Sequence, residues 1–347
     1  MATPDVYYQA GTPELSKIVN SPSLNPSPKE TQDSLKRSFA KYLAADHGSS
    51  AIGKLFDPSS HLSYEEPKHI HTMEEIGYSA SSGVSPVAVS EPFRLFSEEA
   101  VNVMRDEILD PEVQDKYSYT SDLAPKQLRG YAPKHGKFIF EAWKHPQTLA
   151  IVSKIAGVDL VPVMDYEIGH INLSVPGDKK EYKSPAMETE DGEDAIVGWH
   201  RDSYPFVCVL MMSDTTGRYI DHQALRAFGG QERITMVTSF RPRSTSIRDD
   251  TILTTVRPIS NLSDLYGQTV EYQLENVESR IRRMLKNVRD SMKAGATDVK
   301  SIKSFLDREI ETLSHLNKEI VDESLVQKGH LAGVCEEAAR PKRRKME

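Results

Sequence analysis

The sequence predicts an α+β protein in which helices flank an antiparallel β barrel or sandwich, and a helical hairpin follows. The first observation is a change of pattern at Leu160, after which β-branched and aromatic residues dominate the runs LVPVMDYEIGHINLSV, AIVGW, FVCVLMM and ITMVTSF. The second is a return to apolar residues three and four positions apart after Arg243, which is typical of amphipathic helices.

Two helices are expected before the β runs. The first begins after Ser97, whose hydroxyl is a capping group, and continues through EEAVNVMRDEIL with its apolar residues on one face. The second begins at His145 and Pro146, because proline suits the first helical position, and ends at Gly157.

Composition divides the chain into four segments. Residues 1–88 are rich in Ser, Pro, Gly and polar residues, so we predict a loosely structured region with one helix over Thr31–Ala45. Residues 89–243 carry the β runs, 244–330 the helical hairpin, and 331–347 a basic, disordered tail.

The hairpin prediction depends on two apolar stripes separated by a break at Gly295. We expect both stripes to be buried against each other or against the β domain, so that polar substitution of Leu285 or Leu313 costs about 2–5 kcal/mol. A dimerisation coiled coil is the alternative. The stripes comprise Leu274, Val277, Ile281, Leu285, Val288 and Met292, then Val299, Ile302, Phe305, Ile310, Leu313, Leu316 and Ile320.

Composition also bounds the partners and the compartment. Lys and Arg number 43 and Asp and Glu 51, a net charge of −8 that disfavours binding to the phosphate backbone of nucleic acid. Two cysteines fit a reducing compartment, and the chain shows neither a signal peptide nor an apolar run of about 18 residues. We therefore expect a cytoplasmic protein without a membrane partner. The terminal run RPKRRKME is typical of a solvated end or, alternatively, of a nuclear-import signal.

One segment carries most of the chemical information. His200 and Asp202 are two residues apart in a run expected to be extended, so their side chains project to the same side and can reach one metal ion. His222 follows in RYIDHQALRAFGG. Two histidines and one carboxylate can occupy one face of an iron(II) ion and leave positions for a chelating cosubstrate and oxygen. Arg233 then suits a cosubstrate carboxylate, and the Thr235 hydroxyl can add a hydrogen bond.

In this combination the chain resembles the iron(II)/2-oxoglutarate-dependent dioxygenase superfamily, in a branch of fungal, phytanoyl-CoA-hydroxylase-like proteins. The resemblance covers about residues 90–243 and is carried by GWHRDSYPFVCVLM and GGQERITMVTSFRP in this order. It implies a double-stranded β-helix, or jelly roll, with Fe(2+) and with 2-oxoglutarate as cosubstrate.

The resemblance also implies roles for individual residues. Iron would be held by His200, Asp202 and His222, and 2-oxoglutarate would be anchored by Arg233. Arg226 is the competing anchor, but the Arg-x-Thr pair that opens the last strand matches the family pattern better.

The chain departs from the family pattern by an internal deletion. In a jelly roll the His-x-Asp pair ends the second strand and the distal histidine lies on the seventh. Here only the 19 residues 203–221 separate Asp202 from His222, whereas the three intervening strands that are missing need roughly 25–35 residues with their loops. We therefore expect a block to be missing after Gly217 and the jelly roll to be incomplete.

The other polar residues give weaker signals. His69 and His71, with Glu74 and Glu75 nearby, have metal-binding chemistry, but surface histidine pairs are common and we expect no functional site there.

Four residues of the β runs are candidate pocket residues. Tyr166 and Asn172 are expected on one face of a strand, where they can contact the cosubstrate. His170 is expected to be a satisfied core or surface histidine rather than a pocket residue, and Trp199 a packing residue rather than a substrate platform.

These observations predict an oxidoreductase that couples oxidation of a small organic metabolite, as in secondary metabolism, to decarboxylation of 2-oxoglutarate. The alternative is a non-catalytic dioxygenase remnant that acts as a binding scaffold. Its binding surface would be the helical hairpin, which can also form a homodimer.

Overall fold

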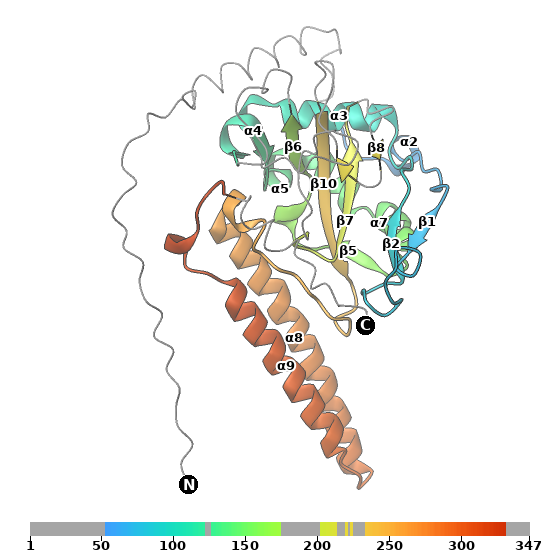
Figure 1. The fold of residues 1–347 in the computed structure, drawn as a ribbon, viewed down its shortest axis with the longest axis vertical. Coiled ribbons are helices and arrows are strands. Elements are labelled where there is room, and N and C mark those ends of the chain that lie inside the picture. The colour runs from blue at the N-terminus through green and yellow to red at the C-terminus, as the bar shows by residue number, and fades with distance from the viewer. Residues whose placement is uncertain are drawn as a thin grey trace, which may run out of the picture. The chain divides into compact units, whose positions relative to one another are not determined.

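The computed structural model describes residues 53–121, 126–174, 202–213, 219–220, 223–224 and 233–330 (Figure 1). All of them belong to one compact unit, His47–Glu347. In these ranges the protein is α+β, as predicted, with helices around a mostly antiparallel sheet. The predicted helix over Thr31–Ala45, the run AIVGW and the tail 331–347 lie outside the described residues.

A six-stranded sheet organises the fold, and the long strand β10 lies at its centre. β5 and β6 lie end to end along one edge of β10, β7 pairs with the other edge, and β4 and β3 continue beyond β6. Among the described strands the sheet does not close into a barrel. The strands are β3 (Ser118–Tyr119), β4 (Lys126–Leu128), β5 (Leu160–Pro162), β6 (His170–Ser174), β7 (Phe206–Met211) and β10 (Arg233–Pro242).

The continuous run predicted from Leu160 is in fact two strands, β5 and β6, separated by a 3-10 helix at Asp165–Glu167. The break has a packing cause at Gly169, whose φ is +71° and at which an added Cβ would lie 2.8 Å from Cγ2 of Ile139. Only glycine satisfies both conditions at this position.

The two helices expected from capping signals are confirmed. Ser97 accepts a hydrogen bond from the backbone N–H of Ala100 at the start of one helix, and the other ends at Gly157, whose φ is +68°. The helices that precede β5 in the chain are α2 (Pro58–His61), α3 (Glu98–Leu109), α4 (Pro111–Lys116), α5 (Ala132–His135), α6 (Lys137–Lys144) and α7 (Pro146–Ala156).

Two further pairs of short strands lie outside the main sheet. β1 (Ile70–Thr72) pairs with β2 (Val87–Ser90), and β8 (Tyr219–Ile220) pairs with β9 (Gln223–Ala224), both antiparallel. The first pair lies where the sequence indicated little regular structure, because strands of three and four residues are too short to show a period.

One face of the sheet packs against helices. The indole of Trp143, on α6, makes an N–H···S contact of 3.2 Å with Met236, and its ring packs edge-on against Phe240. Both partners are on β10 at alternate positions, so they project from the same face. Residues such as Thr235 project from the opposite face.

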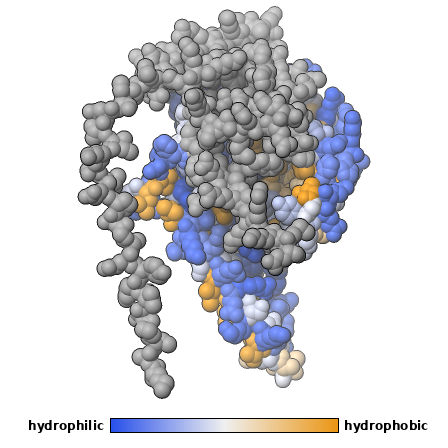
Figure 2. All heavy atoms as spheres, in the orientation of Figure 1, coloured by the Kyte–Doolittle hydropathy of each residue, from blue (hydrophilic) through white to orange (hydrophobic). Residues whose placement is uncertain are grey.

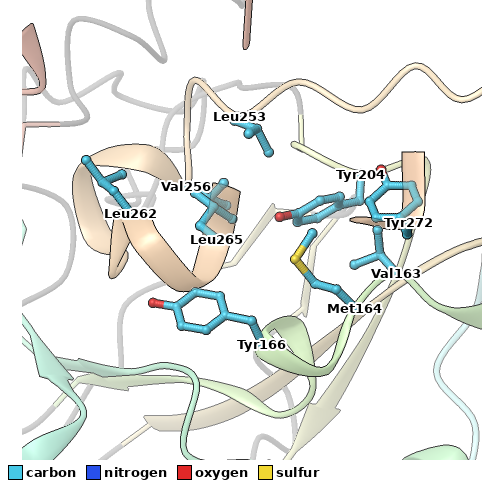
Figure 3. Packing of buried hydrophobic residues seen from close by; sticks show 9 residues of the cluster. All are labelled: Val163, Met164, Tyr166, Tyr204, Leu253, Val256, Leu262, Leu265 and Tyr272. Carbon is cyan, nitrogen blue, oxygen red and sulfur yellow. The ribbon is translucent and has the colours of Figure 1, made fainter. Parts of the chain in front are cut away.

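The helical hairpin consists of α8 (Leu262–Lys293) and α9 (Val299–Glu319). α8 begins earlier than the apolar stripe indicated, because the side chain of Asn261 caps the N–H groups of Ser263 and Asp264. The base of α8 packs onto the sheet through a hydrophobic cluster (Figure 3) of Val163, Met164, Tyr166, Tyr204, Leu253, Val256, Leu262, Leu265 and Tyr272.

The expectation that the apolar stripes of the hairpin are largely buried is wrong. Leu285 is 46% exposed and Leu313 42%, and Val277 is the last buried residue of α8. The reason is geometric: α8 and α9 run beyond the body of the protein (Figure 1), and of the two stripes only Val277 and Phe305 are buried. Figure 2 shows apolar residues scattered along the otherwise hydrophilic surface of the hairpin.

Candidate functional site

A row of polar side chains crosses the face of the sheet opposite Trp143 and α6; we call it the polar face. Gln127 on β4, Asn172 on β6 and Thr235 on β10 are in register across the three strands. Gln127 and Thr235 are buried and Asn172 is half-buried. The amide nitrogen of Gln127 donates to Oδ1 of Asn172 at 2.8 Å. The bond uses the acceptor oxygen of Asn172 and leaves its amide nitrogen as the donor on this face.

Next to this row lies a buried charged group. Arg129 follows β4 and points to the same face as Gln127, because the two residues alternate along an extended backbone. Its Nη1 donates to both carboxylate oxygens of Glu167, which the 3-10 helix presents, and its Nη2 lies 2.9 Å from Nδ1 of His170. Burying an ion pair costs free energy unless its geometry is good. Here the guanidinium of Arg129 contacts both Glu167 and His170, so it links the end of β4 to the 3-10 helix and to β6.

The environment keeps His170 neutral. Burial, reinforced by the positive charge of Arg129, holds the pKa of His170 well below its ordinary value. Because Arg129 has only donors, Nδ1 of the neutral ring accepts the hydrogen bond from its Nη2. His170 is 9% exposed and hydrogen-bonded, so the expectation of a satisfied core histidine is confirmed.

Of the three predicted iron ligands, only Asp202 is among the described residues. His200 and His222 lie outside the described residues, as do Trp199, Gly217 and Arg226. Asp202 is described and is exposed, four residues before β7. The convergence of the three ligands therefore stays a prediction.

The predicted cosubstrate residues lie at the start of β10. The backbone of Arg233 pairs with Ser174, while its side chain lies outside what the structure describes. Thr235 is 2% exposed, and its Cα is in register with those of Asn172 and Met211.

Of the two predicted pocket residues, only Asn172 is on the polar face. Tyr166 is in the 3-10 helix rather than on a strand, so the expected alternation of the two is wrong. Its hydroxyl accepts the N–H of Asn261 at 2.7 Å, and its ring belongs to the hydrophobic cluster at the base of α8.

Sequence reasoning missed Gln127, Arg129 and Glu167. A signal was present in KQLRG, where Gln127 and Arg129 alternate with the apolar Leu128. That alternation predicts a two-faced strand, but the strand has only three residues, and β6, the partner that carries Asn172, is more than 40 residues away in the sequence.

A second group of potential ligands lies on the β1–β2 hairpin. His69, His71 and Glu75 each offer one ligand atom, and these atoms lie within 4.8 Å of one another. The sequence analysis considered the same residues as possible metal ligands, together with Glu74, which is not part of this group.

Comparison with known proteins adds no assignment. No protein-family description, no curated protein and no solved structure matches the chain. Among the described residues, no helix combines the length and apolar character needed to cross a membrane.

Proposed function

We propose that the protein is a non-heme iron(II)/2-oxoglutarate-dependent dioxygenase that oxidises a small organic molecule. The observation that carries the proposal is the buried Thr235, in register with Asn172 and on the same face of the sheet as a neutral His170. Polar groups on a partly enclosed face suit a small, oxygen-rich ligand.

The order of the strands supports a jelly roll that lacks part of its wall. The last strand, β10, lies between β6 and β7, which precede it in the chain. Such a return of a late strand to lie beside an early one is the Greek-key connection from which jelly rolls are built. The strands that would complete the wall correspond to the block missing after Gly217.

The donor set suits iron. His200, Asp202 and His222 supply two imidazoles and one carboxylate, the set that non-heme iron(II) enzymes use, and the bound ion supplies the oxidising chemistry. In this proposal Arg233 binds the distal carboxylate of 2-oxoglutarate and the Thr235 hydroxyl donates to it. Arg129 fixes the ring of His170 at the edge of the same face.

The test is 2-oxoglutarate binding, measured by calorimetry without oxygen and with manganese(II) in place of iron. Thr235→Val should weaken binding about 10- to 100-fold, because a hydrogen bond to a charged group contributes about 1.5–3 kcal/mol, whereas Thr235→Ser should keep it. Thr238→Val is the matched control on the opposite face, where Thr238 accepts the N–H of Gly169. Equal affinity in Thr235→Val and the unaltered chain would refute the placement.

Turnover tests the effect of the missing block. We expect the chain to bind iron(II) weakly and to form little succinate from 2-oxoglutarate, because the expected deletion after Gly217 removes strands that orient the ligands. Insertion of roughly 30–45 residues after Gly217, taken from a full-length relative, should restore succinate formation with iron(II) and ascorbate. Rapid turnover by the short chain would show that the missing strands are not needed.

A second candidate function is that of a non-catalytic scaffold that self-associates through the hairpin. It is favoured by exposed apolar residues at helical spacing on both helices, which a second copy of the hairpin can bury. The exposed residues are Leu274, Ile281, Leu285, Met292, Val299, Leu306, Ile310 and Leu313.

Self-association is testable by light scattering on the full chain. Leu285→Glu/Leu313→Glu should abolish a dimer while changing the free energy of unfolding of the monomer by no more than about 0.5 kcal/mol, because both sites are on the surface. Ser304→Glu, an exposed position of α9 outside the stripe, should leave the dimer intact. A monomeric unaltered chain would exclude this function.

A further inference from the structure

The β1–β2 hairpin places two imidazoles side by side. His71 is in register with Val89, and the N–H of Glu91 donates to the carbonyl of His69 at 3.0 Å, which continues the ladder to His69. Residues two apart in an extended backbone project from one face. Accordingly, the ring centroids of His69 and His71 are 4.4 Å apart with an edge-to-face angle of 81°.

A carboxylate completes the group from the turn after β1. The N–H of Thr72 donates to Oε2 of Glu75 at 2.6 Å, and the N–H of Glu75 donates to Oγ1 of Thr72 at 3.2 Å. These reciprocal bonds fix the carboxylate beside the strand, with Oε1 3.1 Å from Nε2 of His69.

From this geometry we propose that His69, His71 and Glu75 bind a divalent transition-metal ion of the zinc type, at a site separate from the predicted iron site. Two imidazoles and one carboxylate are donors that zinc prefers, with bonds of about 2.0–2.2 Å. The three ligand atoms lie within 4.8 Å of one another, so small movements of the side chains bring them to one ion.

The exposure of His69 and Glu75 favours metal binding over a purely structural role. The side chains of His69 and Glu75 are each 46% exposed, so an ion reaches them directly and water fills its remaining positions. A contact between an exposed histidine and an exposed carboxylate contributes little to stability by itself. A bound ion, by contrast, would tie β1 to the turn that follows it.

The experiment removes the predicted iron ligands so that one site is observed alone. Full-length His200→Ala/His222→Ala protein is titrated with zinc chloride in a calorimeter, and one equivalent should bind. Adding His69→Ala or His71→Ala should weaken zinc binding tenfold or more, since even loss of a supporting partner costs about 10- to 100-fold.

Matched carboxylate variants test the geometry. Glu75→Gln should weaken zinc binding, whereas Glu74→Gln, one residue away and outside the group, should not. Far-ultraviolet circular dichroism checks that each variant is folded. The proposal is overturned if the combined His69→Ala/His71→Ala variant binds zinc as tightly as its parent, or if Glu74→Gln and Glu75→Gln behave alike.

Discussion

The buried pair of Arg129 and Glu167 provides the most demanding test of the fold and of the polar face. Both side chains are 2% exposed. Glu167→Gln keeps the size of the side chain but leaves a guanidinium charge in the interior without its carboxylate. Breaking a buried pair in this way costs about 3–5 kcal/mol. We expect this loss in the free energy of unfolding, measured by urea titration at neutral pH.

A double-mutant cycle separates the pair from its surroundings. Arg129→Met alone should also destabilise the protein, but the double variant should be closer to the unaltered chain than either single variant, because no unpaired charge remains. Asp159→Asn is the matched control: it breaks the exposed pair with Arg243 and should cost no more than about 1 kcal/mol. Additive losses in the cycle, or a loss below about 1 kcal/mol for Glu167→Gln, would refute the buried pair.

Two further predictions concern a titration and the hairpin. Because His170 is neutral in the folded protein and becomes protonated in the unfolded chain below about pH 6.5, stability should be complete above that pH and fall below it by up to about 1.4 kcal/mol per pH unit. His170→Gln should remove this part of the pH dependence, and an unchanged slope in urea titrations from pH 5 to 7.5 would contradict the assignment. Glu309, which accepts two hydrogen bonds from Arg280, joins α9 to α8. Glu309→Gln should cost about 1–2 kcal/mol and accelerate amide hydrogen exchange in α9, whereas unchanged exchange would show that the pair does not hold the hairpin.

Signals from neighbouring residues correctly predicted the two helices that begin after Ser97 and at Pro146. A capping serine and a proline at the first turn are read directly from neighbouring residues, and both helices begin where these signals occur. The break between β5 and β6 was missed because its cause is the approach of Ile139, which is 30 residues from Gly169. No periodicity carries that information.

The difference between local and long-range causes also explains which features of the hairpin and of the candidate site the sequence predicted. Helical spacing predicted that Leu285 and Leu313 are on helices, but burial depends on how far α8 extends beyond the body. Likewise, the sequence indicated Thr235 and Asn172 separately, whereas the register that aligns them with Gln127 depends on strand pairing across more than 40 residues.

The polar face contains buried atoms that the fold itself does not satisfy. Oε1 of Gln127 and Nε of Arg129 have no hydrogen-bond partner among the described residues. An unsatisfied buried polar atom costs about 1–3 kcal/mol, which offsets the hydrogen bond that Gln127 donates to Asn172. Because Gln127→Leu removes both, we expect it to change the free energy of unfolding by no more than about 1 kcal/mol, while weakening 2-oxoglutarate binding measured as for Thr235. A loss of stability above about 2 kcal/mol with unchanged 2-oxoglutarate binding would instead make Gln127 a structural residue, and the polar face would then no longer support the proposed cosubstrate site.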